Sequence, residues 1–244
     1  MRSVVRHLCW PLLLSCGCLC VACAGGAWPL AAPSSPAGAA AGLDDSQIVA
    51  GLREALAQGV TRAVNELGRP DGFWKDPDVR IPLPDPLAGA EKTLRQFGQG
   101  NKLDNFQLAL NRAAESAVPQ VAIVLGDAVR QMSIKDARAI LAGPPDAATQ
   151  YFRRVSGATL RERMLPIVQG ATAGVGVAQS YKKLAGQIGS WLQPAGKSIP
   201  DLDGYVTDQA LDALFAKIAI EEANIRQNPA ARGSELLRKV FAAP

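Results

Sequence analysis

Apolar residues recur at helical spacing along most of the chain after residue 43. In the first such series they occupy every fourth position, at Ile48, Leu52, Leu56, Val60 and Val64. That spacing places the side chains on one face of a helix, whereas no run alternates apolar and polar residues for long enough to anchor a sheet. The pattern predicts an all-α fold, an irregular multi-helix bundle whose connectors are rich in proline and glycine.

The segment 69–85 interrupts this pattern, because its prolines and its glycine are incompatible with a helix. We expect a packed connector in which Phe73 and Trp74 rest on the core, with at most a minimal extended segment near 79–83. A rim around a binding groove is the alternative that the sequence leaves open.

Residues typical of helix ends mark further boundaries. Pro119 should kink or split the helix that begins near residue 102. The pairs Ser133–Asp136 and Thr159–Glu162 have the spacing of capping boxes, so each predicts the start of a helix. The other expected caps are Asp45 or Ser46 for the first helix and Thr207 for the last long one.

The first residues have the layout of a secretory signal. Arg2 and Arg6 precede an apolar run from Leu8 to Ala24, which is interrupted by small residues and is short for a membrane span. We expect residues 1–24 to be a signal peptide and the mature protein to be exported, in the periplasm or associated with the outer membrane. Residues 25–42 are rich in Pro, Ala and Gly, which indicates a tether, and 43–244 should form one helical domain.

Two cleavage chemistries fit this leader. Ala22-Cys23-Ala24 is a small-x-small site whose cleavage would release a soluble protein. Leu13-Leu14-Ser15-Cys16 resembles a bacterial lipobox with Cys16 as the lipidated residue, and Cys23 ends a second, poorer one. Both remain open at this point, and the second would give the protein a membrane tether through N-terminal lipid.

Composition narrows the chemistry. The five cysteines and the single histidine, His7, all lie within residues 1–24. A mature chain without them has no Ser-His-Asp or Cys-His arrangement, no Cys/His zinc site and no haem held by His or Cys. We therefore expect no cofactor and no metal, although a carboxylate pair, a Ser-Lys dyad or an oxygen-ligand calcium site stays compatible. A formal net charge of +4 is too small to indicate nucleic acid.

Polar residues gather on either side of Pro144-Pro145. The candidate binding residues are Asp136, Arg138, Asp146, Thr149, Gln150, Tyr151, Arg153 and Arg154. One hypothesis is a structural network, in which Asp136 and Asp146 cap helices and Arg138 and Arg153 pair with them. The other is a site for an anion or a sugar at a helix start, where free N–H groups and arginines converge. Four other glutamates at helical positions are Glu91, Glu115, Glu221 and Glu222. Lys92 beside Glu91 and Arg112 near Glu115 indicate solvated helix faces.

Several separated motifs occur in order between residues 43 and 241. They read GRPDGFW, VRIPLP, AEKTLR, NRAAE, DARAILAGPPDAATQYFRRV and QNPAAR. Together they resemble the bacterial domain-of-unknown-function family 4197 (DUF4197). The resemblance implies an exported single-domain protein with no established activity, and it supplies no catalytic residue.

Three functions are compatible with these observations. We expect first a non-enzymatic helical binding or interaction module whose partner is an envelope protein, a polymer or a small ligand. The alternatives are a carboxylate-dependent hydrolase of an envelope polymer, which needs two facing carboxyl groups, and a hydrophobic-ligand carrier, which needs an apolar cavity.

Overall fold

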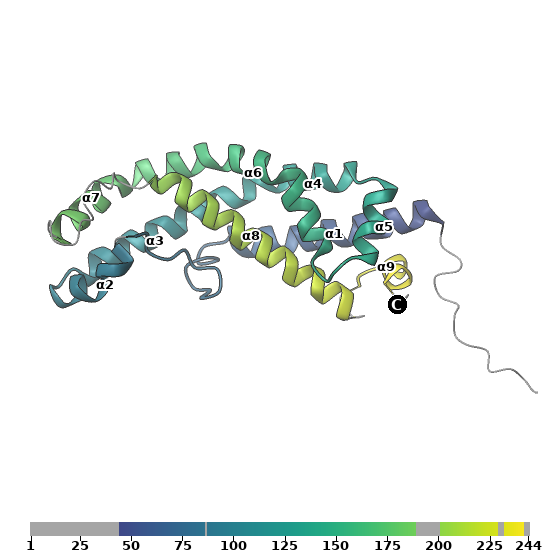
Figure 1. Cartoon of the computed structure of the whole chain (residues 1–244), viewed down its shortest axis with the longest axis horizontal. Helices are drawn as coiled ribbons and strands as arrows, with labels where there is room; N and C mark the ends of the chain where they lie inside the picture. Colours follow the sequence, from purple (N-terminus) through teal and green to yellow (C-terminus); the bar gives the residue numbers. More distant parts are fainter. Residues whose placement is uncertain (1–43, 86, 189–200, 229–231, 242–244) are drawn as a thin grey trace, which may run out of the picture. The chain divides into compact units, whose positions relative to one another are not determined.

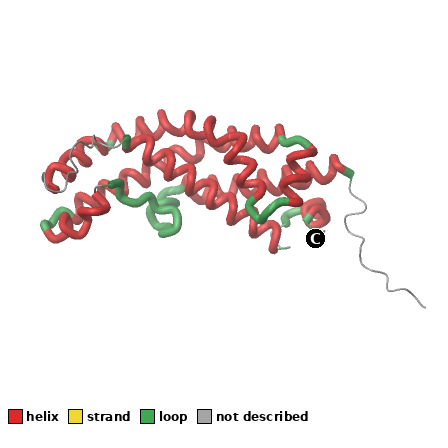
Figure 2. Tube along the Cα trace, in the orientation of Figure 1, coloured by secondary structure: helices red, strands yellow, loops and turns green. Residues whose placement is uncertain are grey.

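Helices form most of the structure, which is a computed structural model and describes residues 44–85, 87–188, 201–228 and 232–241. No strand occurs among these residues, so the predicted all-α fold is confirmed (Figures 1 and 2). The elements are α1 Asp45–Gly68, α2 Leu87–Gln96, α3 Gly100–Ala117, the 3₁₀ turn η1 Val118–Val121, α4 Ala122–Gln131, α5 Ile134–Ala142, α6 Ala147–Gly174, α7 Val177–Ile188, α8 Leu202–Gln227 and α9 Glu235–Val240. The predicted signal peptide (1–24) and tether (25–42), with Cys16 and Cys23, lie outside the described residues.

The core lies between four long helices. α6 packs on α8 and on α3, and α1 packs on α8. The apolar series predicted for α1 faces this core, where Leu52, Leu56, Val60 and Val64 are all buried. Each such side chain contributes about 1.5–3 kcal/mol when it leaves water. The helical spacing of the sequence therefore identified the buried face of α1.

Three helix boundaries lie at or within one residue of their predicted positions. α1 is capped by Asp44, one residue before the expected Asp45 or Ser46, and the Asp44 carboxylate accepts a hydrogen bond from Gln47 N at 2.8 Å. Pro119 does split the helix, because η1 separates α3 from α4. Ser133 and Asp136 form the predicted capping box at the start of α5.

The prediction of a new helix at Thr159–Glu162 was wrong. α6 is continuous from Ala147 to Gly174 and contains Pro166. A proline in a helix interior costs about 3 kcal/mol, because it removes a hydrogen bond and crowds the preceding turn. Leu160, Met164 and Val168 are fully buried on either side of it. Their tertiary packing offsets the local penalty.

Thr207 was also misassigned as a cap. α8 begins at Leu202, where the Asp201 carboxylate accepts a hydrogen bond from Gly204 N at 2.9 Å. Thr207 lies inside the helix, and its hydroxyl donates to Asp203 O at 2.7 Å. A threonine that bonds back to the preceding turn is tolerated within a helix, so its presence did not mark the helix start.

The last helix packs against the first. α9 contacts α1, and a methyl group placed on Gly51 would approach Val240 Cγ2 to 2.8 Å. Any larger residue at Gly51 would separate the two helices. Glycine at this position thus permits the C-terminal segment to close against the beginning of the domain.

Candidate functional site

The connector 69–85 is attached to α3 by a buried asparagine. The Asn111 side chain accepts a hydrogen bond from Ile81 N at 2.9 Å and donates to Ile81 O at 3.1 Å. The Asn111 side chain thus pairs with the backbone of Ile81 as a neighbouring β-strand would. It satisfies an N–H and a carbonyl group that have no partner in a helix or a sheet. Val79, Ile81 and Leu83 are consequently buried without forming a strand.

A buried glutamate holds the beginning of the same connector. Glu115 is 4% exposed, and its Oε1 accepts hydrogen bonds from Phe73 N at 3.1 Å and Trp74 N at 3.2 Å. Its other oxygen, Oε2, accepts from Arg112 Nη1 at 2.6 Å. The expectation that Glu115 lies on a solvated face was wrong, because this carboxylate replaces the missing backbone partners of a non-helical turn.

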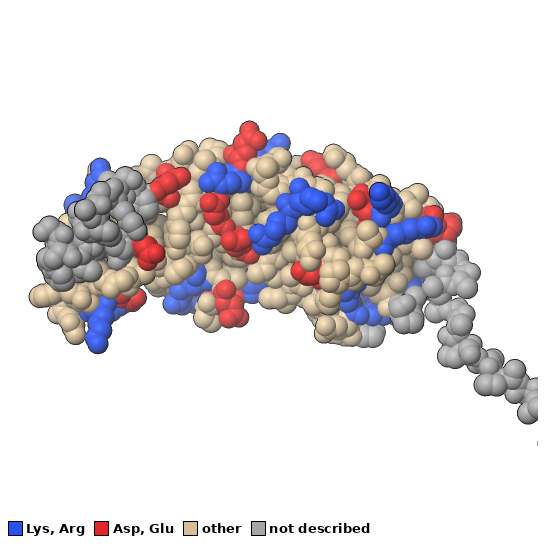
Figure 3. All heavy atoms as spheres, in the orientation of Figure 1, with Lys and Arg blue, Asp and Glu red and all other residues tan. Residues whose placement is uncertain are grey.

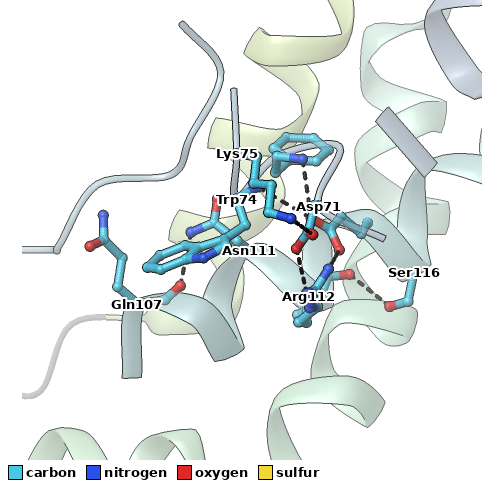
Figure 4. A network of polar contacts seen from close by, with 10 residues as sticks. Asp71, Trp74, Lys75, Gln107, Asn111, Arg112 and Ser116 are labelled. Atoms are coloured by element: carbon cyan, nitrogen blue, oxygen red, sulfur yellow. Dashed lines mark hydrogen bonds and ion pairs between the residues drawn. The ribbon is translucent and has the colours of Figure 1, made fainter. Parts of the chain in front are cut away.

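Arg112 extends this network to the surface. Its Nη2 donates to Asp71 Oδ1 at 2.6 Å, and Lys75 Nζ lies 2.7 Å from Asp71 Oδ2, so that both cations reach one carboxylate (Figure 4). The hydrogen bonds from Lys75 and Arg112 hold the pKa of Asp71 below its ordinary value. Asp71 has a φ of 69°, a left-handed conformation that is uncommon outside glycine. The network therefore maintains a sharp turn.

Two further contacts complete the attachment of the connector. Phe73 is fully buried, as predicted, while Trp74 is half-buried and carries the Arg80 guanidinium 4.7 Å from its ring centroid. Lys217 of α8 lies 2.7 Å from Asp76 Oδ2 and 2.9 Å from Glu66 Oε1. The predicted packed connector is confirmed, and its polar groups bind residues of α3 and α8.

A second buried glutamate stabilises the start of α6. Glu222 is 5% exposed and accepts hydrogen bonds from Ala148 N at 2.9 Å and Thr149 N at 3.0 Å. Arg226 Nη2 donates to the same carboxylate at 2.9 Å and to Ile140 O at 2.8 Å. Glu222 thus supplies, from α8, the cap that sequence analysis had expected from Asp146. The Asp146 side chain makes no cap hydrogen bond and instead accepts from Gln150 at 3.0 Å.

The predicted binding residues separate into several environments. Thr149 is buried against Glu222, with 3.0 Å between its hydroxyl and Oε2. Arg138 pairs with Asp45 at 2.5 Å and Arg153 with Asp212 at 2.8 Å, so the expected pairing of these arginines with Asp136 and Asp146 was wrong.

Three of the predicted residues do lie near one another. The Arg154 guanidinium is 5.6 Å from the Tyr151 ring centroid, and its charge also acts on Asp136. Hydrogen bonds from Ser133 lower the pKa of Asp136, while burial raises the pKa of Tyr151, whose hydroxyl donates to Ala128 O at 3.2 Å. Asp136 and Tyr151 are thus hydrogen-bonded within the domain, and Arg154 lies against the Tyr151 ring. The role of these residues in binding stays a prediction.

An apolar groove lies elsewhere, between α3, the end of α6 and α7. It has a volume of about 930 Å³. Residues 102, 105, 106, 108, 109, 112, 113 and 116 form its α3 wall and lie on one side of the helix. The apolar lining includes Phe106, Ala109, Ala113, Val175, Val177 and Leu184. The groove could not be predicted from the sequence, because the residues on its walls have the same apolar spacing as residues that pack in a core.

The described lining of the groove is basic. It contains Lys102, Arg112 and Lys183, and no aspartate or glutamate. Elsewhere on the face seen in Figure 3, basic and acidic side chains are interspersed. Some of them pair between helices, as Arg161 Nε of α6 does with Asp208 Oδ1 of α8 at 2.7 Å. Arg112 is paired with Glu115 and Asp71, whereas Lys102 and Lys183 form no ion pair with a carboxylate among the described residues.

A smaller hollow of about 380 Å³ does contain carboxylates. Asp201 and Asp203 line it at the start of α8. Both are engaged, since Asp201 caps α8 and Asp203 accepts a hydrogen bond from the Thr172 hydroxyl at 2.6 Å. In the part of the chain that the structure describes, no three His, Cys, Asp or Glu side chains are placed to hold a metal ion. Nor does any described helix combine the length and apolar character of a membrane span.

Comparison with known proteins identifies a family and nothing more specific. No curated protein and no solved structure matches the chain. The family model described as "Protein of unknown function (DUF4197)" matches residues 42–242, which include every helix and both buried glutamates described above. The chain therefore belongs to the DUF4197 family.

Proposed function

We propose that this protein is an exported, non-enzymatic binding module whose α3–α7 groove holds the acyl chain of a lipid. The observation that carries the proposal is the groove itself, an apolar depression of about 930 Å³. This volume lies within the roughly 300–1,000 Å³ range of small-molecule sites. The export of the protein rests on the signal-like layout of residues 2–24.

The length of the groove suits an extended chain. Lys102 and Ser116 mark the ends of its α3 wall. At 1.5 Å per residue, fourteen residues of helix correspond to about 21 Å. An acyl chain in one bilayer leaflet spans about 15 Å, half of the hydrocarbon core. One chain can therefore lie along α3 with most of its surface out of water.

The polar groups of the domain support binding rather than hydrolysis. Hydrolysis of a glycosidic polymer needs two carboxyl groups that face a common substrate. Glu115 and Glu222 are buried and fully engaged with backbone N–H groups and arginines. The described lining of the groove contributes no carboxylate.

A fluorescent uncharged ligand tests the proposal. The methyl ester of 11-(dansylamino)undecanoic acid should bind to the purified protein saturably, with a blue shift of its emission as the dye enters an apolar environment. Val175 is 61% exposed on the groove wall, so Val175→Trp should fill the groove without disturbing the core. We expect this variant to weaken binding about tenfold, which corresponds to about 1.4 kcal/mol.

Val155→Trp is the matched control. Val155 is 48% exposed on α6 and does not line the groove, so the same substitution there should leave binding unchanged. Circular dichroism would verify that both variants are folded. Absence of saturable binding to the wild-type protein, or equal loss in the two variants, would refute the proposal.

A further inference from the structure

The two lysines of the groove differ from its arginine. Arg112 is already paired with Glu115 and Asp71, each at 2.6 Å. Lys102 and Lys183 form no ion pair with any carboxylate in residues 44–85, 87–188, 201–228 or 232–241. Two cations on the rim of an apolar groove thus keep their full capacity for a negatively charged group.

The course of the helices places both lysines at one end of the groove. The Phe106 and Tyr181 rings, whose centroids are 6.1 Å apart, join α3 to α7. α7 continues from α6 toward α2 and the first turns of α3 (Figure 1), and α2 contacts both α3 and α7. Lys102 precedes Phe106 by one turn and Lys183 follows Tyr181, so the two ammonium groups flank the same end.

Nearby carboxylates do not neutralise this end. Asp104 and Glu91 are both bound by Arg95, whose Nη2 lies 2.6 Å from Asp104 Oδ1 and whose Nε lies 2.9 Å from Glu91 Oε1. Arg112 is ten residues along α3 from Lys102, which is about 15 Å. An anionic group at the lysines would therefore leave room for an acyl chain along the apolar part of the groove.

From this arrangement we infer that the ligand is a single-chain anionic amphiphile, with its head group between Lys102 and Lys183 and its chain along Phe106, Ala109 and Val177. This inference rests on the proposed function and specifies the chemistry of its ligand. Charge-assisted hydrogen bonds from the two ammonium groups select the anion, and the apolar walls take the chain. A fatty-acid carboxylate is the simplest molecule of this class.

A matched pair of ligands separates the inference from the function on which it rests. 11-(Dansylamino)undecanoic acid and its methyl ester share the dye and the chain and differ in the negative charge. The wild-type protein should bind the acid about tenfold more tightly than the ester, because a hydrogen bond to a charged group contributes about 1.5–3 kcal/mol. Equal affinity for the two ligands overturns the inference alone, whereas binding of neither ligand overturns the proposed function as well.

Charge reversal of single lysines on α3 and α7 tests the assigned position of the head group. Lys183→Glu and Lys102→Glu should each abolish the preference for the acid while leaving the affinity for the ester within about twofold of the wild type, since the apolar walls are intact. Lys182→Glu introduces the same charge next to Lys183, at an exposed residue outside the groove lining, and should preserve the preference. Lys183→Arg should preserve it too. Equal effects of Lys182→Glu and Lys183→Glu contradict the assigned head-group position.

Discussion

The two long sides of α3 meet very different neighbours. On one side Asn111 and Glu115 bind the connector 69–85 through hydrogen bonds to backbone groups of Phe73, Trp74 and Ile81. On the other side Phe106, Ala109 and Ala113 face an open groove. One helix thus combines a buried polar attachment with a side that lines an apolar groove, where Phe106 and Ala113 are themselves buried. This difference is the reason to interpret the groove as a binding surface.

Removal of the buried Glu115 carboxylate should lower the stability of the protein more than any other change proposed below. Glu115→Ala leaves Phe73 N and Trp74 N without acceptors and Arg112 without its buried partner. A buried donor left without an acceptor costs about 1–3 kcal/mol, and the exposed Arg112 guanidinium adds little because it keeps its pair with Asp71. Urea denaturation should show this loss as a lower midpoint. Glu91→Gln, which removes an exposed pair with Arg95, should change stability by less than about 1 kcal/mol. Similar midpoints for the two variants would contradict the anchoring role of Glu115.

Two asparagines on α3 provide a more direct comparison. Asn111→Ala removes both hydrogen bonds to Ile81 in a buried position and should cost about 2–3 kcal/mol. Asn105 is exposed on the groove side, so Asn105→Ala should change stability by less than about 0.5 kcal/mol. Thermal unfolding of both variants gives the answer, and a comparable loss at Asn105 would show that the groove side is also a packed surface.

The smallest expected effect is a pH dependence of the free energy of unfolding that arises from Asp76 in the connector. The hydrogen bond from Lys217 lowers the pKa of Asp76 in the folded protein. Asp76 therefore contributes stability above the unfolded aspartate pKa of about 3.9, and this contribution disappears as the pH falls through the lower folded value. The effect should be a fraction of a kcal/mol, because the ion pair is partly solvated.

Asp76→Asn tests this assignment. The variant should be less stable than the wild type at pH 6, and the difference should shrink as the pH is lowered below about 3.9. Asp78→Asn, at an exposed neighbouring residue, should follow the wild-type pH profile. A difference between the Asp76→Asn and wild-type proteins that stays constant at low pH would assign the effect to packing instead.

Much of the fold could be predicted because its signals are local. The apolar spacing of α1, the break at Pro119 and the Ser133–Asp136 capping box all operate within a few turns of helix. The continuity of α6 through Pro166 could not be predicted in this way, because it depends on packing against α3 and α8.

The polar contacts were harder to predict for the same reason. Arg138 pairs with Asp45 and Arg153 with Asp212, which lie 93 and 59 residues away in the chain. Glu222 did carry a signal that could have been used, because it follows Leu211, Leu214 and Ile218 on the inward face of α8. A charged residue in such a register indicates a buried partner. The groove offers no equivalent signal, since its apolar residues follow core-like spacing.

The closure of α9 on α1 at Gly51 has a consequence for how the polypeptide is made. α1 also contacts α3, α4 and α5, but its contacts with α8 and α9 can form only after residues 202–240 have been synthesised. Contacts so distant in sequence slow folding and delay it until the last residues emerge from the ribosome. The side of α1 around Gly51 therefore stays uncovered until residues 235–240 are in place.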